Sequence, residues 1–467
     1  PLYISPFRAP PDRHHHPQQK RVPLMTTCSR RNFLKGAVAT GAAIGLTPDL
    51  MAFRWFGRKP SLVDPDRKLN IACVGCGGKG ASDIAGVSSE NIVGLCDVDF
   101  GRARDTFSKY PDARTYRDYR SMLQDLGDDI DAVTISTPDH MHFPIAMMAM
   151  HMGKHVYVQK PCAHTIAEAR KLARAAKAYG VVTQMGNQGH ATDDTRRIVA
   201  WIREGAIGEV REVHLYTDRP IWPQNGPMPE AATPPASMDW NLWLGTAPYR
   251  PYPAGGPHFR WRGWWDYGCG ALGDMGCHIM DAAFWALDLR NPLWVEAVSD
   301  AASPDLTPSW SIVTYQFGAR GNRPPLKLVW HDGGKMPPRP PQLEEGRSMP
   351  PKDGGQIFYG SNGCIMAGCY GNSPRIFPET RMREVGRPKQ MPPTIKGGNF
   401  QEWIRACKGG SAAGSNLVDY AGALTETVLL GNLAIRAGKR ITWDAKSMRC
   451  VDNPAADAYI SHPYRVF

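Results

Sequence analysis

The sequence predicts an α/β protein with a doubly wound parallel sheet in its first half. A second α/β domain, built on an open and largely antiparallel sheet, is predicted in the other half. The first sheet is predicted because short apolar runs alternate with helix-like stretches between residues 69 and 185. The second is predicted by runs at 294–299, 312–317 and 326–330, in which apolar and polar residues alternate. A chain of 467 residues has room for two or three domains.

The positive charge of the chain is concentrated at its beginning. Residues 1–59 carry ten Lys and Arg side chains against two acidic ones, which is a net charge of +8 out of +11 for the whole chain. The other 408 residues are therefore close to neutral and contain no basic stripe. This distribution argues against a nucleic-acid-binding protein.

The chain has eleven cysteines without a repeated spacing, which does not indicate a disulfide framework. Cys73 and Cys76 form a C-x-x-C pair, which is either a redox or metal pair or a strand residue followed by a residue of a glycine loop. We favour the second interpretation and expect no metal ion, because no other C-x-x-C pair completes a zinc site.

Residues 1–59 predict a disordered extension, an export signal and a linker. Residues 1–24 are rich in Pro, His and Arg without periodicity, and Met25 is a candidate for the true start. The run S-R-R-N-F-L-K at 29–35 precedes a short apolar stretch and resembles a twin-arginine signal. The alternative is a basic N-terminus that only looks like a signal. We expect the twin-arginine machinery to export the folded protein to the periplasm.

A glycine-rich turn follows the first predicted strand. Gly75, Gly77 and Gly80 have the spacing G-x-G-x-x-G, which lets the backbone approach a pyrophosphate at a helix N-terminus. Asp97 ends the second strand, 17 residues after Gly80, where an acid binds adenosine ribose hydroxyls. The alternative is a glycine turn in an unrelated α/β protein. We predict a Rossmann domain that binds NAD rather than NADP, because Asp97 and Asp99 would repel a 2′-phosphate.

Three later strands of this sheet are predicted to end in polar motifs. These are T-P-D-H-M-H at 137–142, Q-K-P at 159–161 and G-N-Q-G-H at 186–190. Ligands of doubly wound sheets bind at the carboxyl ends of the strands. We therefore expect the motifs to lie near the glycine turn, with a helix from Pro144 to Met152 after the first of them.

The order of these motifs resembles the Gfo/Idh/MocA family of oxidoreductases, which includes glucose–fructose oxidoreductase and inositol dehydrogenase. The resemblance covers residues 68–450. It implies an NAD-binding domain at 68–190, a substrate domain at 191–450 and a tail at 451–467. It also implies that Thr137, His142 and Lys160 bind the cofactor together with the glycines and Asp97. In the family a Glu precedes the Lys-Pro pair, whereas this chain has Gln159 there.

A helix is predicted from Gly273 to about residue 287, with Asp274 and His278 on one face and Asp281 a turn further along. An Asp in the first turn is stabilised by the helix dipole, and a His with a pKa near neutrality accepts protons. The alternative for such a pair is an ordinary surface contact. The family's substrate domain carries the same D-x-x-x-H, and the resemblance implies that Lys160, Asp274 and His278 are catalytic. His278 is expected to take the hydroxyl proton, Lys160 to bind the developing alkoxide, and Asp274 to orient the substrate or His278.

Residues 219–265, here called the aromatic segment, hold six of the fourteen tryptophans. Indole rings suit the apolar faces of pyranose rings, but they also pack loop-rich regions. The run at 264–270 and the G-N-Q-G-H motif resemble a secreted, twin-arginine branch of the family. We expect His190, Tyr267 and Asp281 to bind the substrate.

The expected function is oxidation of a CH–OH group in a sugar, glycoside or polyol, with NAD retained because free NAD is scarce outside the cytoplasm. One alternative is an NAD-dependent glycosidase that oxidises, eliminates, hydrates and reduces its substrate, with Tyr267 or His190 abstracting the C2 proton. Another is a non-catalytic periplasmic sugar-binding protein, with which Gln159 is compatible. Family members are often dimers or tetramers, so a homo-oligomer is also expected.

Overall fold

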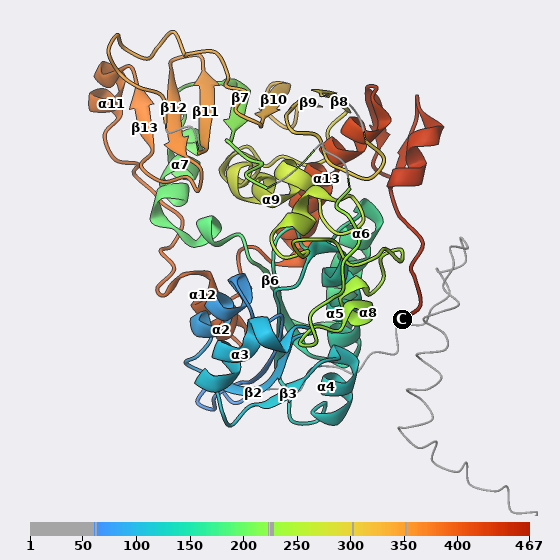
Figure 1. Cartoon of the computed structure of the whole chain (residues 1–467). Helices are drawn as coiled ribbons and strands as arrows, with labels where there is room; N and C mark the ends of the chain where they lie inside the picture. Colours follow the sequence, from blue (N-terminus) through green and yellow to red (C-terminus); the bar gives the residue numbers. More distant parts are fainter. Residues whose placement is uncertain (1–59, 61–62, 223, 225–227, 301–302, 351–352) are drawn as a thin grey trace, which may run out of the picture. The chain divides into compact units, whose positions relative to one another are not determined.

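The computed structural model describes residue 60 and residues 63–222, 224, 228–300, 303–350 and 353–467 (Figure 1). The expected extension, signal and linker at 1–59 lie outside the described residues. Among the residues that are described, no helix is long and apolar enough to cross a membrane.

The first sheet has six parallel strands in the order β3-β2-β1-β4-β5-β6, which confirms the predicted doubly wound topology. The order reverses between β1 and β4, and ligands bind at such a reversal. Its strands are β1 Asn70–Val74, β2 Asn91–Cys96, β3 Arg114–Tyr116, β4 Ala132–Ile135, β5 His155–Val158 and β6 Thr183–Met185. Its helices are α2 Lys79–Gly86, α3 Phe100–Lys109, α4 Tyr119–Asp125, α5 Asp139–His151 and α6 Ile166–Tyr179.

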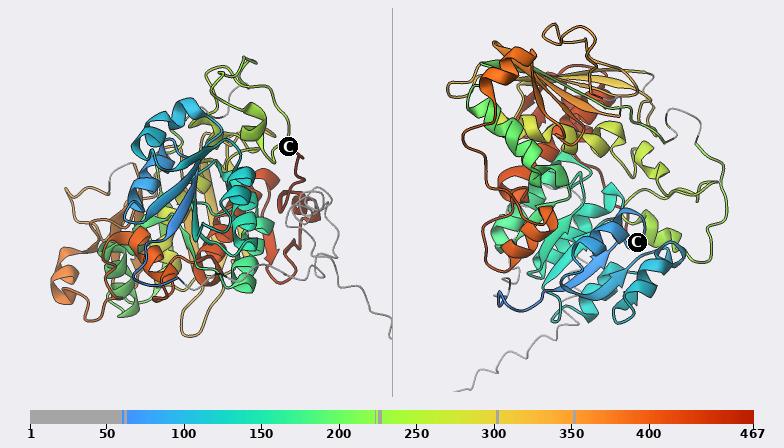
Figure 2. Two further views of the ribbon diagram at one scale, coloured as in Figure 1. Left: turned by 90° about the horizontal axis from the view of Figure 1, so that it is seen from below. Right: turned by 90° about the vertical axis from the view of Figure 1, so that its left-hand side faces the viewer.

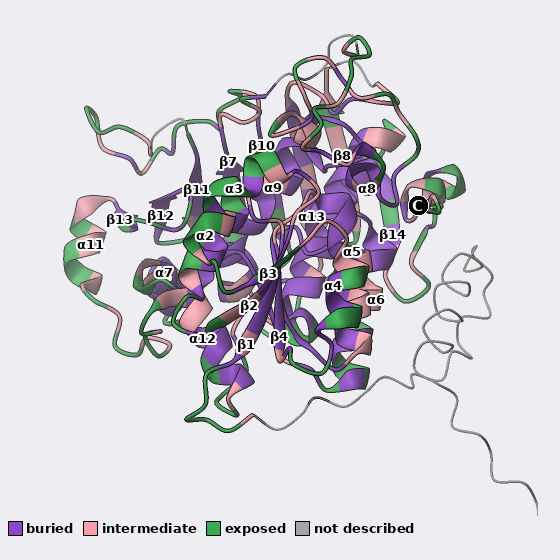
Figure 3. Cartoon of the chain, turned by 60° about the horizontal axis from the view of Figure 1, so that its bottom comes forward, coloured by how far each residue is buried: buried purple, intermediate pink, exposed green. Residues whose placement is uncertain are grey.

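Both faces of this sheet are buried, and Figure 3 shows its central strands in the buried colour between helices. Alternate residues of β1 enter two different cores: Ala72 and Val74 face one, and Ile71 and Cys73 face the other. Continuous apolar runs are typical of parallel strands because both faces are covered.

Helix α5 begins earlier than the sequence suggested, at Asp139 rather than at Pro144. A proline is common at the start of a helix, but here it lies inside one, and its missing N–H leaves the carbonyl of His140 without a helical partner. The hydroxyl of Thr246 donates a hydrogen bond to that carbonyl at 3.3 Å. A contact from the second domain therefore makes the internal proline tolerable.

The second sheet has nine strands in the order β13-β12-β11-β7-β10-β9-β8-β14-β15. Only β7 and β10 pair in parallel, so the predicted, largely antiparallel sheet is confirmed. Its strands are β7 Val210–Tyr216, β8 Trp294–Ser299, β9 Ser311–Phe317, β10 Leu326–His331, β11 Gly355–Gly360, β12 Gly363–Gly368, β13 Arg375–Phe377, β14 Ile441–Asp444 and β15 Arg449–Cys450.

Helices α9 (Gly270–Ile279) and α13 (Gly422–Ala437) pack against one face of this sheet (Figures 1 and 2). The remaining α-helices are α7 Asp193–Arg203, α8 Trp240–Leu244, α10 Asp281–Ala286, α11 Glu379–Val385 and α12 Gly398–Cys407. The single helix expected from Gly273 is in fact two helices, α9 and α10, separated at Met280. Helix α9 also begins three residues earlier than expected, at Gly270, so Asp274 lies in its second turn, where the predicted stabilisation by the helix dipole is lost.

The aromatic segment connects the second sheet back to the first. The amide of Phe100 donates to the carbonyl of Ser237 at 3.0 Å, and the amide of Asp239 donates to the carbonyl of Val98 at 2.9 Å. Both contacts lie just beyond the carboxyl end of β2. The segment therefore borders the edge where the glycine turn and Asp97 are found.

Candidate active site

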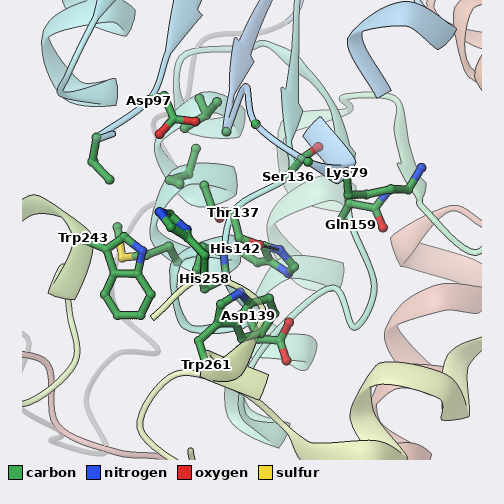
Figure 4. A pocket seen from close by; sticks show the side chains of 18 of the residues that line it. Lys79, Asp97, Ser136, Thr137, Asp139, His142, Gln159, Trp243, His258 and Trp261 are labelled. Carbon is green, nitrogen blue, oxygen red and sulfur yellow. Dashed lines mark hydrogen bonds between the residues drawn. The ribbon is translucent and has the colours of Figure 1, made fainter. Parts of the chain in front are cut away.

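A cavity of about 570 Å³ lies between the carboxyl ends of the first sheet and residues of the second domain. In Figure 4, Asp97 lies toward one end, Asp139 and Trp261 lie toward the other, and Thr137 and His142 lie between them. The predicted site residues that line this cavity are Gly75, Gly77, Asp97, Thr137, His142, Lys160, Asp274 and His278.

The glycine turn has the shape that a dinucleotide requires. Gly75 has a φ of 84°, and a Cβ at this position would lie 2.5 Å from the carbonyl oxygen of Ser136. A Cβ at Gly80 would collide with the carbonyl of Gly75, so this glycine allows close packing of α2 without lining the cavity. Helix α2 follows with no side-chain cap at Gly78, so no side chain takes the place of a phosphate oxygen at this helix end. These residues fit the pyrophosphate of NAD.

Asp97 closes the glycine turn onto the end of β2. Its carboxylate accepts hydrogen bonds from the amide of Cys76 at 2.7 Å and from the amide of Asp99 at 2.9 Å. Burial raises the pKa of this carboxyl above its ordinary value. The side chain lines the cavity at the position expected for the adenosine ribose.

Asp99 does not line the cavity, contrary to the expectation that it faces a 2′-phosphate. Its carboxylate caps helix α3 and pairs with His258 Nε2 at 2.8 Å. Arg102, which the sequence argument missed, lies over the turn instead: a Cβ on Gly77 would be 2.7 Å from its Cγ. Of the two acids, only Asp97 remains to discriminate between NAD and NADP.

A buried carboxylate lies beside Gln159 even though the family's Glu is missing. Gln159 Nε2 donates to Asp83 Oδ2 at 2.8 Å, and the hydroxyl of Ser136 donates to the same oxygen at 2.7 Å. Lys79 Nζ pairs with the other oxygen at 2.5 Å. Asp83 is fully buried on α2, so the negative charge comes from a different element. The sequence feature that could have identified Asp83 was an acidic residue at a buried helix position, three residues after Gly80.

Lys160 and Asp274 meet across the two domains. Lys160 Nζ lies 2.9 Å from Asp274 Oδ1 and donates to the carbonyl of Asp274 at 2.8 Å. Arg262 Nε donates to the same Oδ1 at 3.0 Å. Burial alone would raise the pKa of Asp274, but Lys160 and Arg262 overcome it and hold the pKa well below its usual range. Asp274 thus contacts Lys160 and Arg262, and among the described residues no hydrogen bond joins it to His278.

His278 lies one turn beyond Asp274 on α9 and is 5% exposed. Burial, and then the positive charge of Lys160, lower the pKa of His278 to about 3. The expected pKa near neutrality is therefore wrong, because it neglected both effects. The imidazole is neutral at physiological pH, and its Nδ1 has no hydrogen-bond partner among the described residues.

Asp139 is a second acid in this part of the cavity that the sequence argument left unassigned. It begins α5, and its Oδ2 accepts a hydrogen bond from the amide of Cys269 at 3.1 Å. Burial raises the pKa of Asp139 to about 7, despite the opposing charges of Lys160 and Arg262. The acidic residue within the T-P-D-H-M-H motif was the feature of the sequence that could have identified Asp139.

His190, Tyr267 and Asp281 do not line the cavity. His190 Nδ1 lies 3.0 Å from Asp281 Oδ1, which also accepts from the hydroxyl of Tyr420 at 2.8 Å. The helix break at Met280 places Asp281 in this buried polar cluster. Tyr267 packs in an aromatic core with Trp243 and Trp264.

Both expectations for the aromatic segment apply, because its tryptophans divide between core and cavity. Trp243 and Trp261 line the cavity. The other four, Trp222, Trp240, Trp264 and Trp265, are buried. Trp261 lies against Arg262, a partner of Asp274, so one indole ring is available at the end of the cavity where Lys160 and Asp274 lie, whereas Trp243 also belongs to the aromatic core.

The described residues thus combine a Rossmann sheet and a second α/β domain around a cavity whose glycine turn fits a dinucleotide. Residues 69–187 match the model of the oxidoreductase family NAD-binding Rossmann fold, and residues 210–323 match the C-terminal alpha/beta domain of the same family. The chain belongs to the Gfo/Idh/MocA family, a family of sugar and polyol oxidoreductases. Residues 27–47 match a twin-arginine translocation signal.

Curated relatives match parts of the chain. Glycosyl hydrolase family 109 protein 2 of Shewanella sp. (strain ANA-3) is 29% identical over 207 residues, 40% of this chain and 45% of the relative. Levoglucosan dehydrogenase of Pseudarthrobacter phenanthrenivorans is 29% identical over 169 residues, 36% of this chain and 35% of the relative. The matched region thus spans less than half the length of either relative.

Among solved structures, the WlbA dehydrogenase of Bordetella pertussis in complex with NADH and UDP-GlcNAcA has a TM-score of 0.57. It is 18% identical, and the match covers 81% of this chain and 99% of that one. At this identity the likeness shows the fold.

Proposed function

We propose that this protein oxidises a CH–OH group of a sugar, glycoside or polyol with NAD as the cofactor. The observation that carries the proposal is the contact between Lys160 and Asp274, which joins the end of β5 to helix α9 inside one cavity. The cavity also contains the glycine turn, so a bound dinucleotide and a substrate would share it.

A nicotinamide bound in this cavity would supply the acceptor for the hydride that leaves the substrate carbon. Lys160 Nζ donates a hydrogen bond to the substrate oxygen and stabilises negative charge that develops there. Asp274 holds that ammonium group in place. His278 is neutral and therefore able to accept the hydroxyl proton, although the nearby Lys160 makes it a weak base.

NAD is favoured over NADP because Asp97 lies where a 2′-phosphate would be placed. Arg102 acts in the opposite direction, since its guanidinium lies over the glycine turn near the cavity. The preference is therefore expected to depend on how far Asp97 outweighs Arg102.

Retention of the cofactor during export to the periplasm is supported by contacts of the aromatic segment. Arg117 Nη1 donates to the carbonyl of Ser237 at 2.7 Å, and His258 pairs with Asp99. Both contacts lie beside the predicted adenosine end of the cavity. A nucleotide bound beneath these contacts would dissociate slowly. Because the twin-arginine route carries proteins that have already folded, the protein could be exported with the nucleotide bound.

The glycosidase remains a second candidate, because one curated relative is named for family 109 glycosyl hydrolases. Such a cycle needs another base for the C2 proton. Asp139 lines the cavity, whereas Tyr267 and His190 do not, so Asp139 takes their place as the candidate.

The test uses protein purified after export, with no cofactor added. It is incubated with sugars and aryl glycosides while the absorbance of reduced nicotinamide and the products are followed. Reduction that stops at one equivalent would identify a dehydrogenase awaiting an electron acceptor. Continued aglycone release without net reduction would identify the glycosidase. Retained NAD with no reaction on any compound would contradict both and favour a sugar-binding protein.

A further inference from the structure

Arg262 is held rigidly at the substrate end of the cavity. Its Nε donates to Asp274 Oδ1 at 3.0 Å, and its Nη1 donates to the carbonyl of Phe259 at 3.4 Å. The guanidinium lies 4.4 Å from the ring centroid of Trp261 and 5.1 Å from that of Phe259. Nη2 makes no hydrogen bond to any described residue, so this nitrogen of the Arg262 guanidinium is available to a ligand.

The backbone that holds Arg262 is strained. Phe259 has a φ of 66°, a left-handed conformation that is unfavourable for an aromatic residue. Its carbonyl is the one that binds Arg262 Nη1. Strain of this kind persists where the surrounding structure requires a particular geometry, and here that geometry fixes the guanidinium.

The charges at this end of the cavity do not balance. Asp274 is a single carboxylate with two cationic partners, Lys160 and Arg262. Asp139 adds little negative charge below neutral pH, since burial raises its pKa to about 7. Arg219 lines the same cavity, while its partner Asp218 does not. The cavity wall at this end therefore presents three cationic side chains, Lys160, Arg262 and Arg219, against fewer ionised carboxylates, and such a wall attracts an anion.

The alkoxide formed during oxidation does not account for all of these groups. Lys160, a compact point charge, suffices for one oxygen atom. Arg262 Nη2 and the guanidinium nitrogens of Arg219 that do not pair with Asp218 can each donate to one oxygen of a carboxylate. Two arginines in addition to Lys160 therefore indicate a second anionic group on the substrate.

We propose that the substrate is an acidic sugar, such as a uronic acid or its glycoside, whose carboxylate is bound by Arg262 and Arg219. This inference rests on the proposed function, because it names the substrate class of the same site. The indole of Trp261 would lie against the sugar ring beside the carboxylate.

The test compares matched pairs, methyl glucoside with methyl glucuronide and methyl galactoside with methyl galacturonide, on NAD-loaded enzyme in single turnover. We expect each acid to half-saturate the enzyme at a concentration about 10- to 100-fold below that of its neutral partner, as for a charge-assisted hydrogen bond. Arg219→Gln should reduce this ratio toward one. Arg260→Gln is the matched control: Arg260 belongs to the same segment, donates to the carbonyl of Ala254 and does not line the cavity.

Binding without turnover gives an independent readout. Each acid should raise the melting temperature of the NAD-loaded enzyme more than its neutral partner does, and added salt should diminish the difference. Neutral sugars that react as well as the acids would overturn the inference while leaving the proposed function intact. An acid preference unaffected by Arg219→Gln would overturn the assignment to these arginines. Failure of every sugar to reduce the cofactor would instead count against the proposed function.

Discussion

The two ends of the cavity are built in different ways. At the cofactor end, Gly75, Asp97 and Thr137 follow the ends of three neighbouring strands of one sheet, and the contacts are largely made by backbone groups. At the substrate end, Lys160, Arg262 and Asp274 come from three segments and are joined by charged side chains. A local motif can specify the first arrangement, whereas the second exists only after the domains have packed. The four predictions below test this contrast.

Lys160→Ala removes the contact between the two domains at the substrate end, and the largest effect is expected here. Turnover should fall about 1000-fold, because the group that stabilises the alkoxide is lost. NAD content should be unchanged, since the glycine turn is untouched. Single-turnover absorbance and the NAD released by acid measure the two quantities. Lys177→Ala, an exposed change on α6, is the control. Full activity in the Lys160 variant would remove this residue from the site.

Asp139→Asn tests the electrostatics of the substrate end. The pKa of Asp139 is about 7 in the folded protein, above its ordinary value of 3.8. The folded state therefore binds this proton more tightly than the unfolded state does, and stability falls as pH rises from about 4 to 7. Asn carries no charge. Between pH 5 and pH 7, the free energy of unfolding of the variant should therefore fall by up to about 3 kcal/mol less than that of the wild type.

Denaturant unfolding at several pH values measures this difference for Asp139→Asn. Asp125→Asn on the exposed surface of α4 is the control and should show the wild-type pH dependence. Parallel pH curves for the wild type and Asp139→Asn would show that Asp139 is ionised throughout.

His190→Ala tests whether His190 belongs to the substrate end of the cavity. The ring of His190 packs on Trp285 with a centroid distance of 4.4 Å and hydrogen-bonds Asp281. Its loss should lower the free energy of unfolding by about 2 kcal/mol, because Asp281 loses a buried partner. The turnover and half-saturation of the folded fraction should stay within error of the wild type. If the folded variant instead needed a higher substrate concentration for half-saturation, with its turnover unchanged, His190 would belong to the substrate site.

Asp97→Ala tests the cofactor end and carries the smallest expected effect. NAD affinity should fall about 10-fold, since ribose contacts and the acceptor for the Cys76 amide are both lost. The ratio of NAD to NADP affinity should fall as well. Fluorescence titration of the stripped protein with each nucleotide measures both, and Asp105→Ala on the exposed face of α3 is the control. Unchanged affinities would exclude Asp97 from the cofactor site.

Most of the fold could be predicted, because periodicity and turn chemistry are local. The run T-I-A-E at 165–168 has the pattern of a capping box, and Thr165 and Glu168 form one at the start of α6, which ends at the left-handed Gly180. Helix boundaries were less predictable when distant contacts intervened. Pro144 lies inside a helix because the carbonyl of His140, which its missing N–H leaves free, accepts the hydroxyl of Thr246 from the second domain. The helix break at Met280 likewise places Asp281 in a buried polar cluster and not in the cavity.

The sequence by itself determined the doubly wound sheet, the glycine turn with Asp97 at the end of β2, and the family, since each depends on residues close together in the chain. The tertiary structure decided which charges meet at the substrate end. Lys160 and Asp274 are 114 residues apart, and Asp83 supplies a carboxylate beside Gln159 from 76 residues away. Only packing brings such groups within hydrogen-bond distance. Burial then sets their charge states, which is why His278 is neutral and Asp139 is poised near pH 7.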